Sequence, residues 1–199
     1  MRIFKLFIIF CIYSSCSPYN VPPAIQRDFF CYEGTQLSDS IIKFTGYFIK
    51  PGVGNLFFLS DGIFVMSSWY SDKSPCDNYK NTANQEKYPQ NNINAFYFGI
   101  YKIDGKIIKA QWLNPSTADT YYAFEDWYEV IDKSTIRLIY SKNIGVLNGD
   151  KSHEKYYKNE KPFTFVSACD TLLVSKTWLK SKKWFWCDER KYFQWKKEQ

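Results

Sequence analysis

The side chains used in common enzyme mechanisms are few and widely separated in this 199-residue chain. The single histidine, His153, stands beside Lys151 and Glu154 in a polar stretch, where a solvated role is usual. No serine occupies a nucleophile-elbow motif, and no glycine-rich loop could hold a phosphate. Glu125 and Asp126 are adjacent, so on a strand they face opposite sides and cannot act as an acid–base pair. We therefore expect a protein that is not an enzyme and that has no cofactor.

The first 15 residues have the pattern of a secretory signal. Arg2 and Lys5 are positively charged, residues 6–13 are apolar, and Ser14 and Ser15 are small. The apolar run is too short to cross a bilayer, which takes about 20 residues. The alternative, a buried first strand or helix, leaves the cations and the small pair unexplained.

Cleavage after Ser15 would leave Cys16 as the first residue. A small residue followed by cysteine resembles the lipobox of bacterial lipoproteins, although Tyr13 stands where leucine is commonest. This resemblance implies that Cys16 carries acyl chains such as palmitate and attaches the protein to a membrane, since several chains make a firm anchor. By the sorting pattern of that family, Ser17 in place of aspartate implies the outer membrane of the bacterial envelope. No acidic cluster follows Cys16, so we expect the periplasmic face rather than the cell surface.

Beyond the signal, the chain divides into a tether, one domain and a tail. Residues 16–30 hold three prolines and few apolar side chains, which predicts a flexible, extended tether. Residues 31–187 form one domain, and residues 188–199 form a basic, aromatic tail. Lysine and arginine number 16 against 17 acidic residues over 17–175, but eight against three over 176–199. Because the positive charge belongs to the ends, we expect no nucleic-acid partner.

Apolar runs separated by turn residues predict an all-β protein. Asp61-Gly62, Asp104-Gly105 and the turn at 132–134 each lie between two apolar runs, which indicates hairpins. Eight candidate strands in sequence predict a closed, up-and-down antiparallel barrel, because an open meander would expose two edges; a sandwich is the alternative. The residues after the last strand predict a short helix over 171–181, packed outside the barrel. The candidate strands cover residues 41–49, 55–59, 63–70, 95–103, 107–113, 120–131, 135–142 and 161–168, and 71–94 and 143–160 are expected to be polar loops.

Hairpin partners on one face share parity, which assigns side chains to the barrel interior. The outer face then holds Glu129 opposite Arg137, and it also holds Phe96 and Phe98, which need the C-terminal segment as a cover. Asp126 is unusual as a carboxylate among inward tyrosines, so it could bind a polar ligand group, be satisfied by tyrosine hydroxyls, or be turned outward by a bulge. The candidate ligand-binding residues in the lumen are Tyr97, Tyr101, Trp112, Tyr122, Asp126, Tyr128 and Tyr140.

Several stretches together, including FTGYF, LFFLSDGIFV and TWLKSKKWFW, resemble the small lipocalin-like lipoproteins of Bacteroidota over about residues 41–187. The Gly-x-Trp signature of animal lipocalins is absent, since residues 46–48 read Gly-Tyr-Phe. The resemblance implies a barrel with an outside helix and a lumen, and it supplies no catalytic residues.

The remaining cysteines, an even number in an exported chain, predict two disulfides. Only one histidine and no Cys-x-x-Cys pair occur, so we expect no metal site. A helix after residue 169 would hold Cys169 and Cys187 too far apart to join. We favour Cys31–Cys169 with Cys76–Cys187, where the second resembles the tail-to-barrel link of many lipocalins.

Two functions remain open from the sequence. The first is a lipid-anchored barrel that binds a small apolar or amphipathic ligand. The second is an interaction or inhibitor module with a solid core that docks another envelope protein. The tail, with Trp178, Trp184, Trp186 and Trp195 among lysines, has the composition of a membrane-interface or acidic-glycan contact. The alternative is packing on the barrel, which we expect for Trp178 and Trp184 because they are placed to cover Phe96 and Phe98. We expect residues 190–197 to be the more mobile part of the tail.

Overall fold

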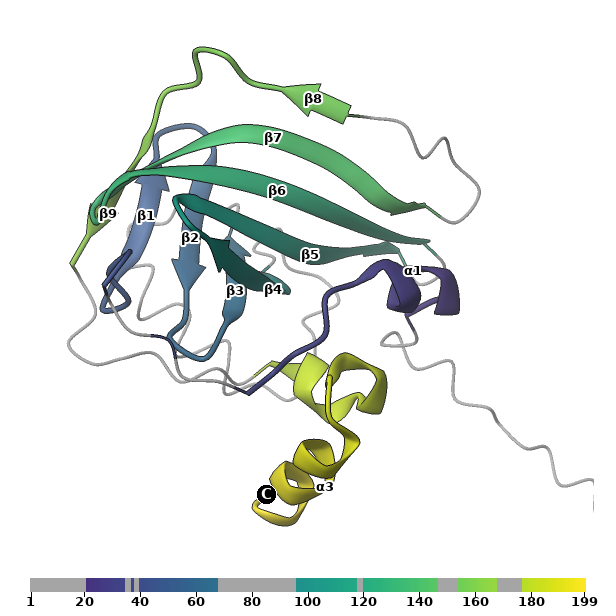
Figure 1. Cartoon of the computed structure of the whole chain (residues 1–199). Helices are drawn as coiled ribbons and strands as arrows, with labels where there is room; N and C mark the ends of the chain where they lie inside the picture. The colour runs from purple at the N-terminus through teal and green to yellow at the C-terminus, as the bar shows by residue number, and fades with distance from the viewer. Residues whose placement is uncertain are drawn as a thin grey trace, which may run out of the picture.

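The computed structural model describes residues 21–34, 37, 40–67, 96–117, 120–146, 154–167 and 177–199. Eight antiparallel strands form a closed barrel in the order β6-β5-β4-β3-β2-β1-β9-β7, and β6 pairs with β7 to close the ring (Figure 1). The predicted all-β, up-and-down barrel is confirmed. The strands of the ring are β1 (Tyr47–Lys50), β2 (Gly54–Phe58), β3 (Ile63–Ser67), β4 (Phe96–Asp104), β5 (Ile107–Thr117), β6 (Thr120–Asp132), β7 (Thr135–Val146) and β9 (Phe163–Val166).

All three predicted hairpins are present. The strand register places Phe58 opposite Phe64, Asp104 opposite Ile107 and Asp132 opposite Thr135. These turns lie at one end of the barrel, which we call the hairpin end. The other end, where residues 118–119 connect β5 to β6, is the loop end. Gly62 and Gly105 have φ angles of 89° and 58°, a region that favours glycine and explains its place in both turns.

Among the strands, two segments differ from the sequence prediction. The first ring strand begins at Tyr47 instead of residue 41, and the buried Ile42 and Phe44 join the inner apolar cluster. The expected loop 143–160 contains the end of β7 and a further strand, β8 (Glu154–Tyr156), which pairs with residues 140–142 outside the ring. All three residues of β8 are exposed, so the alternation that reveals a half-buried strand was missing from this stretch.

The barrel separates two apolar clusters. The inner cluster fills the ring and includes Phe48, Phe58, Phe64 and Tyr128. The outer cluster lies between the barrel wall and two covering segments, one from each end of the chain. Phe96 is buried in the outer cluster and Phe98 packs against it, as the strand parity predicted.

The N-terminal cover is formed by residues that we expected to belong to the tether. Pro23–Asp28 form helix α1, and Val21, Ile25 and Phe29 are buried in the outer cluster. Prolines are well tolerated at the first turn of a helix, so the proline-rich sequence fits a helix start as well as an extended chain. Ile25 comes so close to Gly145 of β7 that a Cβ there would lie 2.4 Å from its Cγ1. The flexible tether therefore excludes residues 21–30.

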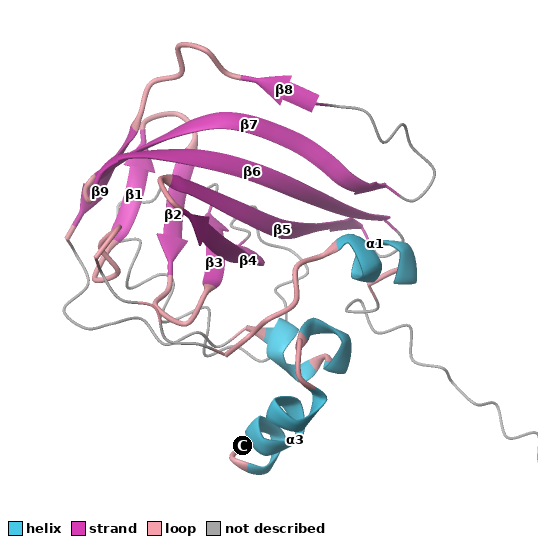
Figure 2. Ribbon diagram, in the orientation of Figure 1, coloured by secondary structure: helices cyan, strands magenta, loops and turns pink. Residues whose placement is uncertain are grey.

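The C-terminal cover consists of two 3₁₀ turns, η1 (Trp178–Ser181) and η2 (Lys183–Phe185), followed by helix α3 (Glu189–Lys197) (Figure 2). Trp178 and Trp184 pack against the outer cluster, as expected. Of the helix predicted over 171–181, residues 171–176 lie outside the described residues and the rest is the η1 turn. The α-helix begins instead after Asp188, whose side chain accepts a hydrogen bond from the Arg190 amide at 2.8 Å.

The tail is held more firmly than its sequence suggests. We expected residues 190–197 to be mobile because they offer little apolar surface. In the structure they lie in α3, Tyr192 is buried, and the rings of Trp186 and Trp195 lie 5.9 Å apart.

None of the described helices is long and apolar enough to span a bilayer.

A disulfide joins the two covering segments. Cys31 is bonded to Cys187, so both favoured pairings, Cys31–Cys169 and Cys76–Cys187, are wrong. The Tyr32 amide donates to the Phe185 carbonyl at 2.6 Å and the Cys187 amide donates to the Tyr32 carbonyl at 3.0 Å. These bonds hold the Cα atoms of the two cysteines 4.9 Å apart, within bonding range. Cys16, Cys76 and Cys169 lie outside the described residues.

Candidate ligand site in the barrel

Six of the seven predicted lumen residues lie on the inner face of the barrel. Tyr101, Trp112 and Tyr128 belong to the inner cluster, and Tyr97 packs against it. Strands β5 and β6 pair without a shift from Ile107 to Asn114, so alternation along β6 also places Tyr122 and Asp126 inside.

Tyr140 is the exception, because a β-bulge changes its side. Trp127 pairs with Tyr140 and Tyr128 pairs with Leu138, which leaves Ile139 as an extra residue in β7. Tyr140 therefore shares the outer face with Trp127, at a ring distance of 4.7 Å, and with Tyr156 of β8, at 4.8 Å. Burial and the neighbouring Glu154 carboxylate, which accepts its hydrogen bond, raise the pKa of Tyr140 to about 12. Tyr140 is not a lumen residue.

The hairpin half of the lumen is filled by side chains. Phe58, Phe64 and Tyr128 are at most 2% exposed, and their rings lie 5.2 to 6.4 Å from one another. The Tyr101 hydroxyl donates a hydrogen bond of 2.8 Å to the Leu59 carbonyl, so its polar end is satisfied within the protein. Tyr101 and Tyr128 therefore serve as packed core in this half.

Toward the loop end the inner side chains are more accessible. Tyr97, Phe124 and Tyr122 are half-buried, and Trp112 links them. The ring of Trp112 lies 5.4 Å from Tyr97 and 4.4 Å from Phe124, which in turn lies 6.4 Å from Tyr122. We call Tyr97, Trp112, Phe124 and Tyr122 the aromatic wall. Phe124 was not among the predicted site residues, although its alternation with Tyr122 and Asp126 places it on the same face.

Asp126 lies below the aromatic wall at the border of the filled half. It is buried, and its Oδ2 accepts hydrogen bonds from Trp112 Nε1 at 2.7 Å and from the Tyr128 hydroxyl at 3.4 Å. Burial raises the pKa of Asp126, while hydrogen bonds from Ser141, Trp112 and Tyr128 favour the charged form. A tyrosine hydroxyl contacts this carboxylate, which is one of the alternatives that the sequence left open, and the Trp112 indole donates to it at closer range.

Glu125 faces the opposite side of β6, as the sequence predicted. Its carboxylate accepts hydrogen bonds from Gln111 Nε2 at 2.6 Å and from Trp127 Nε1 at 2.7 Å, and it lies 3.5 Å from the Lys142 ammonium. Gln111 also accepts a hydrogen bond from the Phe30 amide, which ties the N-terminal cover to the barrel. The two carboxylates therefore lie on opposite faces of β6 and have separate hydrogen-bond partners.

The described residues contain no group of three or more metal-ligating side chains. A pocket of about 230 Å³ beside the Asp61-Gly62 turn is lined by Tyr32, Asp61 and Lys102 among others. Asp61 there is already bound by the Lys180 ammonium at 2.7 Å and by the Tyr32 hydroxyl at 3.3 Å. The aromatic wall is therefore the better candidate for a ligand site.

No family model matches this chain, and no curated protein or solved structure matches it.

Proposed function

We propose that this protein is an envelope lipoprotein, anchored through acylated Cys16, whose barrel binds a small apolar or amphipathic ligand. The proposed role is binding, not catalysis. We propose the periplasmic face of the outer membrane as its location. We also propose that the protein is related to the lipocalin-like lipoproteins of Bacteroidota, which its sequence resembles. Cys16 itself lies outside the described residues, so the anchor rests on the sequence pattern at residues 1–16.

The aromatic wall is the observation that carries the proposal. Its four rings form a continuous, partly accessible apolar surface inside the loop end of the barrel. Rings of this kind suit flat or amphipathic molecules, since each offers an apolar face and tyrosine adds a polar tip. Because the hairpin half is filled, the ligand would occupy only the half above Asp126 and must be small.

A matched pair of variants on β4 tests the ligand site. Tyr97 and Phe98 are neighbours that face the inside and the outside of the barrel, respectively. In the purified full-length protein, Tyr97→Ala should weaken binding of a dansyl-labelled short-chain fatty acid by about tenfold, the loss of roughly 1.5 kcal/mol expected for an aromatic contact. Phe98→Ala should leave this affinity unchanged. Equal affinities of the two variants, or no binding by the parent, would exclude the lumen as the ligand site.

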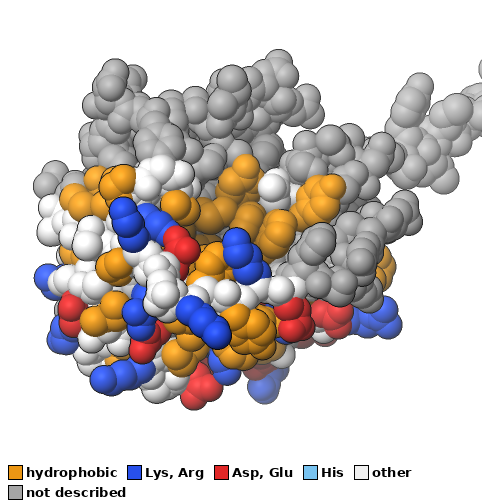
Figure 3. Space-filling model, turned by 90° about the horizontal axis from the view of Figure 1, so that it is seen from above, with side chains coloured by type: hydrophobic (Ala, Val, Ile, Leu, Met, Phe, Trp, Pro, Cys, Tyr) orange, Lys and Arg blue, Asp and Glu red, His pale blue; other side chains and the backbone are white. Residues whose placement is uncertain are grey.

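A second function, docking of an envelope protein by a barrel with a solid core, is favoured by the filled hairpin half and by β8. Tyr156 on β8 is 70% exposed, and β8 pairs within the described residues with β7 alone. Figure 3, which views the molecule from above, shows hydrophobic side chains among lysines and acidic side chains on this face. Native mass spectrometry of the protein purified from its own host separates the two functions: a retained small molecule supports the first, and a retained polypeptide supports the second.

A further inference from the structure

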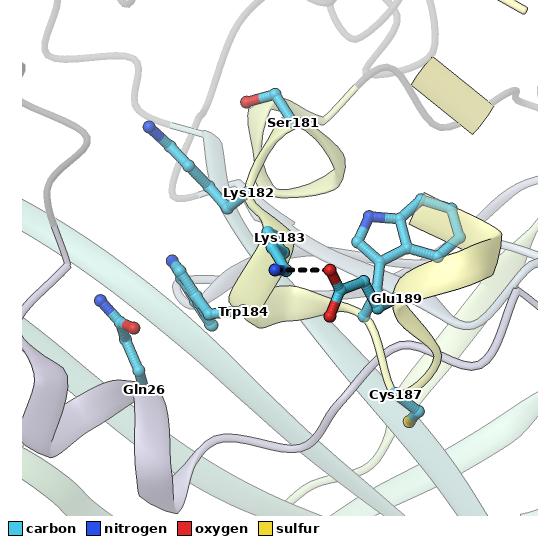
Figure 4. Close-up of a pocket in the computed structure, with 8 residues that line it drawn as sticks. Gln26, Ser181, Lys182, Lys183, Trp184, Cys187 and Glu189 are labelled. Atoms are coloured by element: carbon cyan, nitrogen blue, oxygen red, sulfur yellow. Dashed lines mark ion pairs between the residues drawn. The ribbon is translucent and has the colours of Figure 1, made fainter. Parts of the chain in front are cut away.

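The charged side chains between the two covers already have partners. A pocket of about 640 Å³ lies there, lined by Gln26, Lys182, Lys183 and Glu189 among others (Figure 4). The Lys183 ammonium lies 2.6 Å from the Glu189 carboxylate, and the Lys182 ammonium lies 5.8 Å from the centre of the Trp178 ring. The described residues of this pocket therefore offer no free charge to a ligand.

The buried carboxylate of Asp126 in the barrel differs, because no cation balances its charge. Its partners among the described residues are the hydrogen-bond donors Trp112, Tyr128 and Ser141, and it forms no ion pair there with a lysine or arginine. The charged group that acts on it is a second carboxylate, Glu125, which raises the pKa of Asp126 further. A carboxylate that is 7% exposed and lacks a counter-charge is costly to keep ionised. A cation carried by a ligand would reduce this cost.

The neighbours of Asp126 across the sheet are small. Ala110 lies opposite it on β5 and Ser141 on β7. Continued without a shift from the Tyr128–Leu138 pair, the register would place the Tyr140 ring opposite Asp126, but the bulge at Ile139 places Ser141 there instead. Bulges often redirect side chains beside functional sites. This one replaces a large ring with a small hydroxyl donor, and Ser141 is only half-buried.

The carboxylate can accept a further hydrogen bond. An ionised carboxylate has about four acceptor positions, and Trp112, Tyr128 and Ser141 occupy three of them. A ligand donor can therefore bind Asp126 without leaving one of these three donors unsatisfied.

The aromatic wall leads to this carboxylate. Phe124 and Asp126 are two residues apart on one face of β6, which is about 7 Å along a strand. Trp112 contacts both, since its ring lies 4.4 Å from Phe124 and its Nε1 donates to Asp126 Oδ2 at 2.7 Å. A flat molecule on the wall can therefore reach Asp126 with a short arm. The faces of aromatic rings also attract cations, and tryptophan does so most strongly.

We propose that the ligand of the aromatic wall is an organic ammonium ion whose charged nitrogen binds the Asp126 carboxylate. Its N–H group donates to the acceptor position that the protein leaves unused, and its flat apolar body lies against the wall. This inference rests on the proposed ligand site in the lumen, and it narrows the ligand from any small amphipathic molecule to a cationic one. A carboxylic acid can use the same wall only with its charged end turned toward the loop end, away from Asp126.

Calorimetric titration of the purified full-length parent at pH 8 with three matched probes tests this inference. Naphthylethylamine, which is protonated at this pH, should bind at least about tenfold more tightly than naphthylethanol, because a hydrogen bond between charged groups is stronger than one that involves a neutral donor. Naphthylacetate should show no such gain over the alcohol. Equal affinities for the amine and the alcohol, or a preference for the acid over the amine, would overturn the inference.

Two carboxylate variants on β6 locate the effect. Asp126→Asn keeps an acceptor oxygen but not the charge, so it should bind the amine and the alcohol about equally. The matched control Glu125→Gln removes the neighbouring charge on the opposite face and should keep the preference of about tenfold for the amine. An Asp126→Asn variant that still preferred the amine as strongly as the parent does would contradict the assignment to this carboxylate.

The probes also separate this inference from the proposed function. If none of the three probes bound the parent, the lumen site would fail and the inference would fail with it. If the amine and the alcohol bound equally, the lumen site would stand and only the ammonium ligand would be excluded. This comparison uses the parent alone, so it does not depend on the folding of any variant.

Discussion

At the scale of single residues, Asp126 shows how burial and hydrogen bonding act against each other. Removal from water disfavours its charged form and raises its pKa, whereas donors from Trp112, Tyr128 and Ser141 favour that form. Burial is the larger effect. The inner carboxylate is therefore held at some cost in stability when charged, which is characteristic of residues retained for binding or for core specificity.

The raised pKa makes a signed prediction about stability and pH. The folded protein binds the proton of the Asp126 carboxyl more tightly than the unfolded chain does. The stability gained from this protonation is therefore complete below the ordinary pKa of 3.8, and it is lost as pH rises through the pKa of the folded state. Urea unfolding of the parent and of Asp126→Asn should be measured between pH 4 and pH 8. As pH rises, the free energy of unfolding of the parent should fall relative to that of the variant. A difference in unfolding free energy that stays constant over this pH range would contradict the raised pKa of Asp126.

The same site predicts the cost of losing the acceptor. Asp126→Leu leaves the buried Trp112 Nε1 donor and the Tyr128 hydroxyl without their partner. Each unsatisfied donor costs about 1–3 kcal/mol, so we expect at least about 2 kcal/mol of destabilisation at pH 7. Asp126→Asn keeps an acceptor oxygen and serves as the control in the same urea titrations. Equal stability of the two variants would show that these hydrogen bonds contribute little.

At the scale of elements, the backbone of β5 lies so close to Gly99 of β4 that no side chain fits at this position. A Cβ at this position would lie 1.9 Å from the Gln111 carbonyl oxygen and 2.7 Å from the Trp112 Cα, both backbone atoms. We expect Gly99→Ala to lower the free energy of unfolding by about 3 kcal/mol or more, because the strand ladder must move apart. Gly105→Ala, in an open turn at φ 58°, should cost only about 1 kcal/mol. Thermal unfolding of both variants compares them directly.

The extra strand β8 predicts a separate role for Tyr140. Its ring packs between Trp127 and Tyr156, so it fixes β8 to the outside of the ring. Tyr140→Ala should speed hydrogen exchange of the amides at 154–156 and leave fatty-acid binding unchanged. Slower binding or weaker affinity in this variant would return Tyr140 to the list of ligand contacts.

At the scale of the whole molecule, the Cys31–Cys187 disulfide links the two covers across 156 residues of sequence. Closing so long a loop stabilises a folded chain by roughly 5 kcal/mol in the chain-entropy account. The double variant Cys31→Ser, Cys187→Ser should therefore unfold at clearly lower urea concentration. Non-reducing peptide mapping of the parent should recover residues 31 and 187 in one linked peptide pair, and any other partner for Cys187 would contradict the structure.

The proposed anchor makes a prediction about the location of the whole protein. Cys16→Ala should move the protein from the membrane fraction to the soluble fraction of the host, while the barrel still folds. Formation of the Cys31–Cys187 disulfide in the variant is the control for folding. A variant that still sediments with membranes after a carbonate wash would refute acylation at Cys16.

The sequence by itself determined the local features of this barrel. Turn residues at Asp61-Gly62 and Asp104-Gly105 defined hairpins, and alternation along β4, β5 and β6 assigned inner and outer faces, including the opposed Glu129 and Arg137. These features depend on residues that are neighbours along the chain or across a tight turn, so periodicity and turn chemistry are enough to predict them.

Only the tertiary structure decided the features that depend on distant contacts. The bulge at Ile139 turned Tyr140 outward, and a bulge leaves no reliable mark in a sequence of alternating apolar residues. The proline-rich residues 21–30 became a helix-containing cover because the outer face of the barrel offered Ile25 and Phe29 an apolar surface. The Cys31–Cys187 disulfide forms for the same reason. Both chain ends pack on that face, which brings the Cα atoms of the two cysteines to 4.9 Å from each other. The spacing of cysteines along the chain does not encode this proximity.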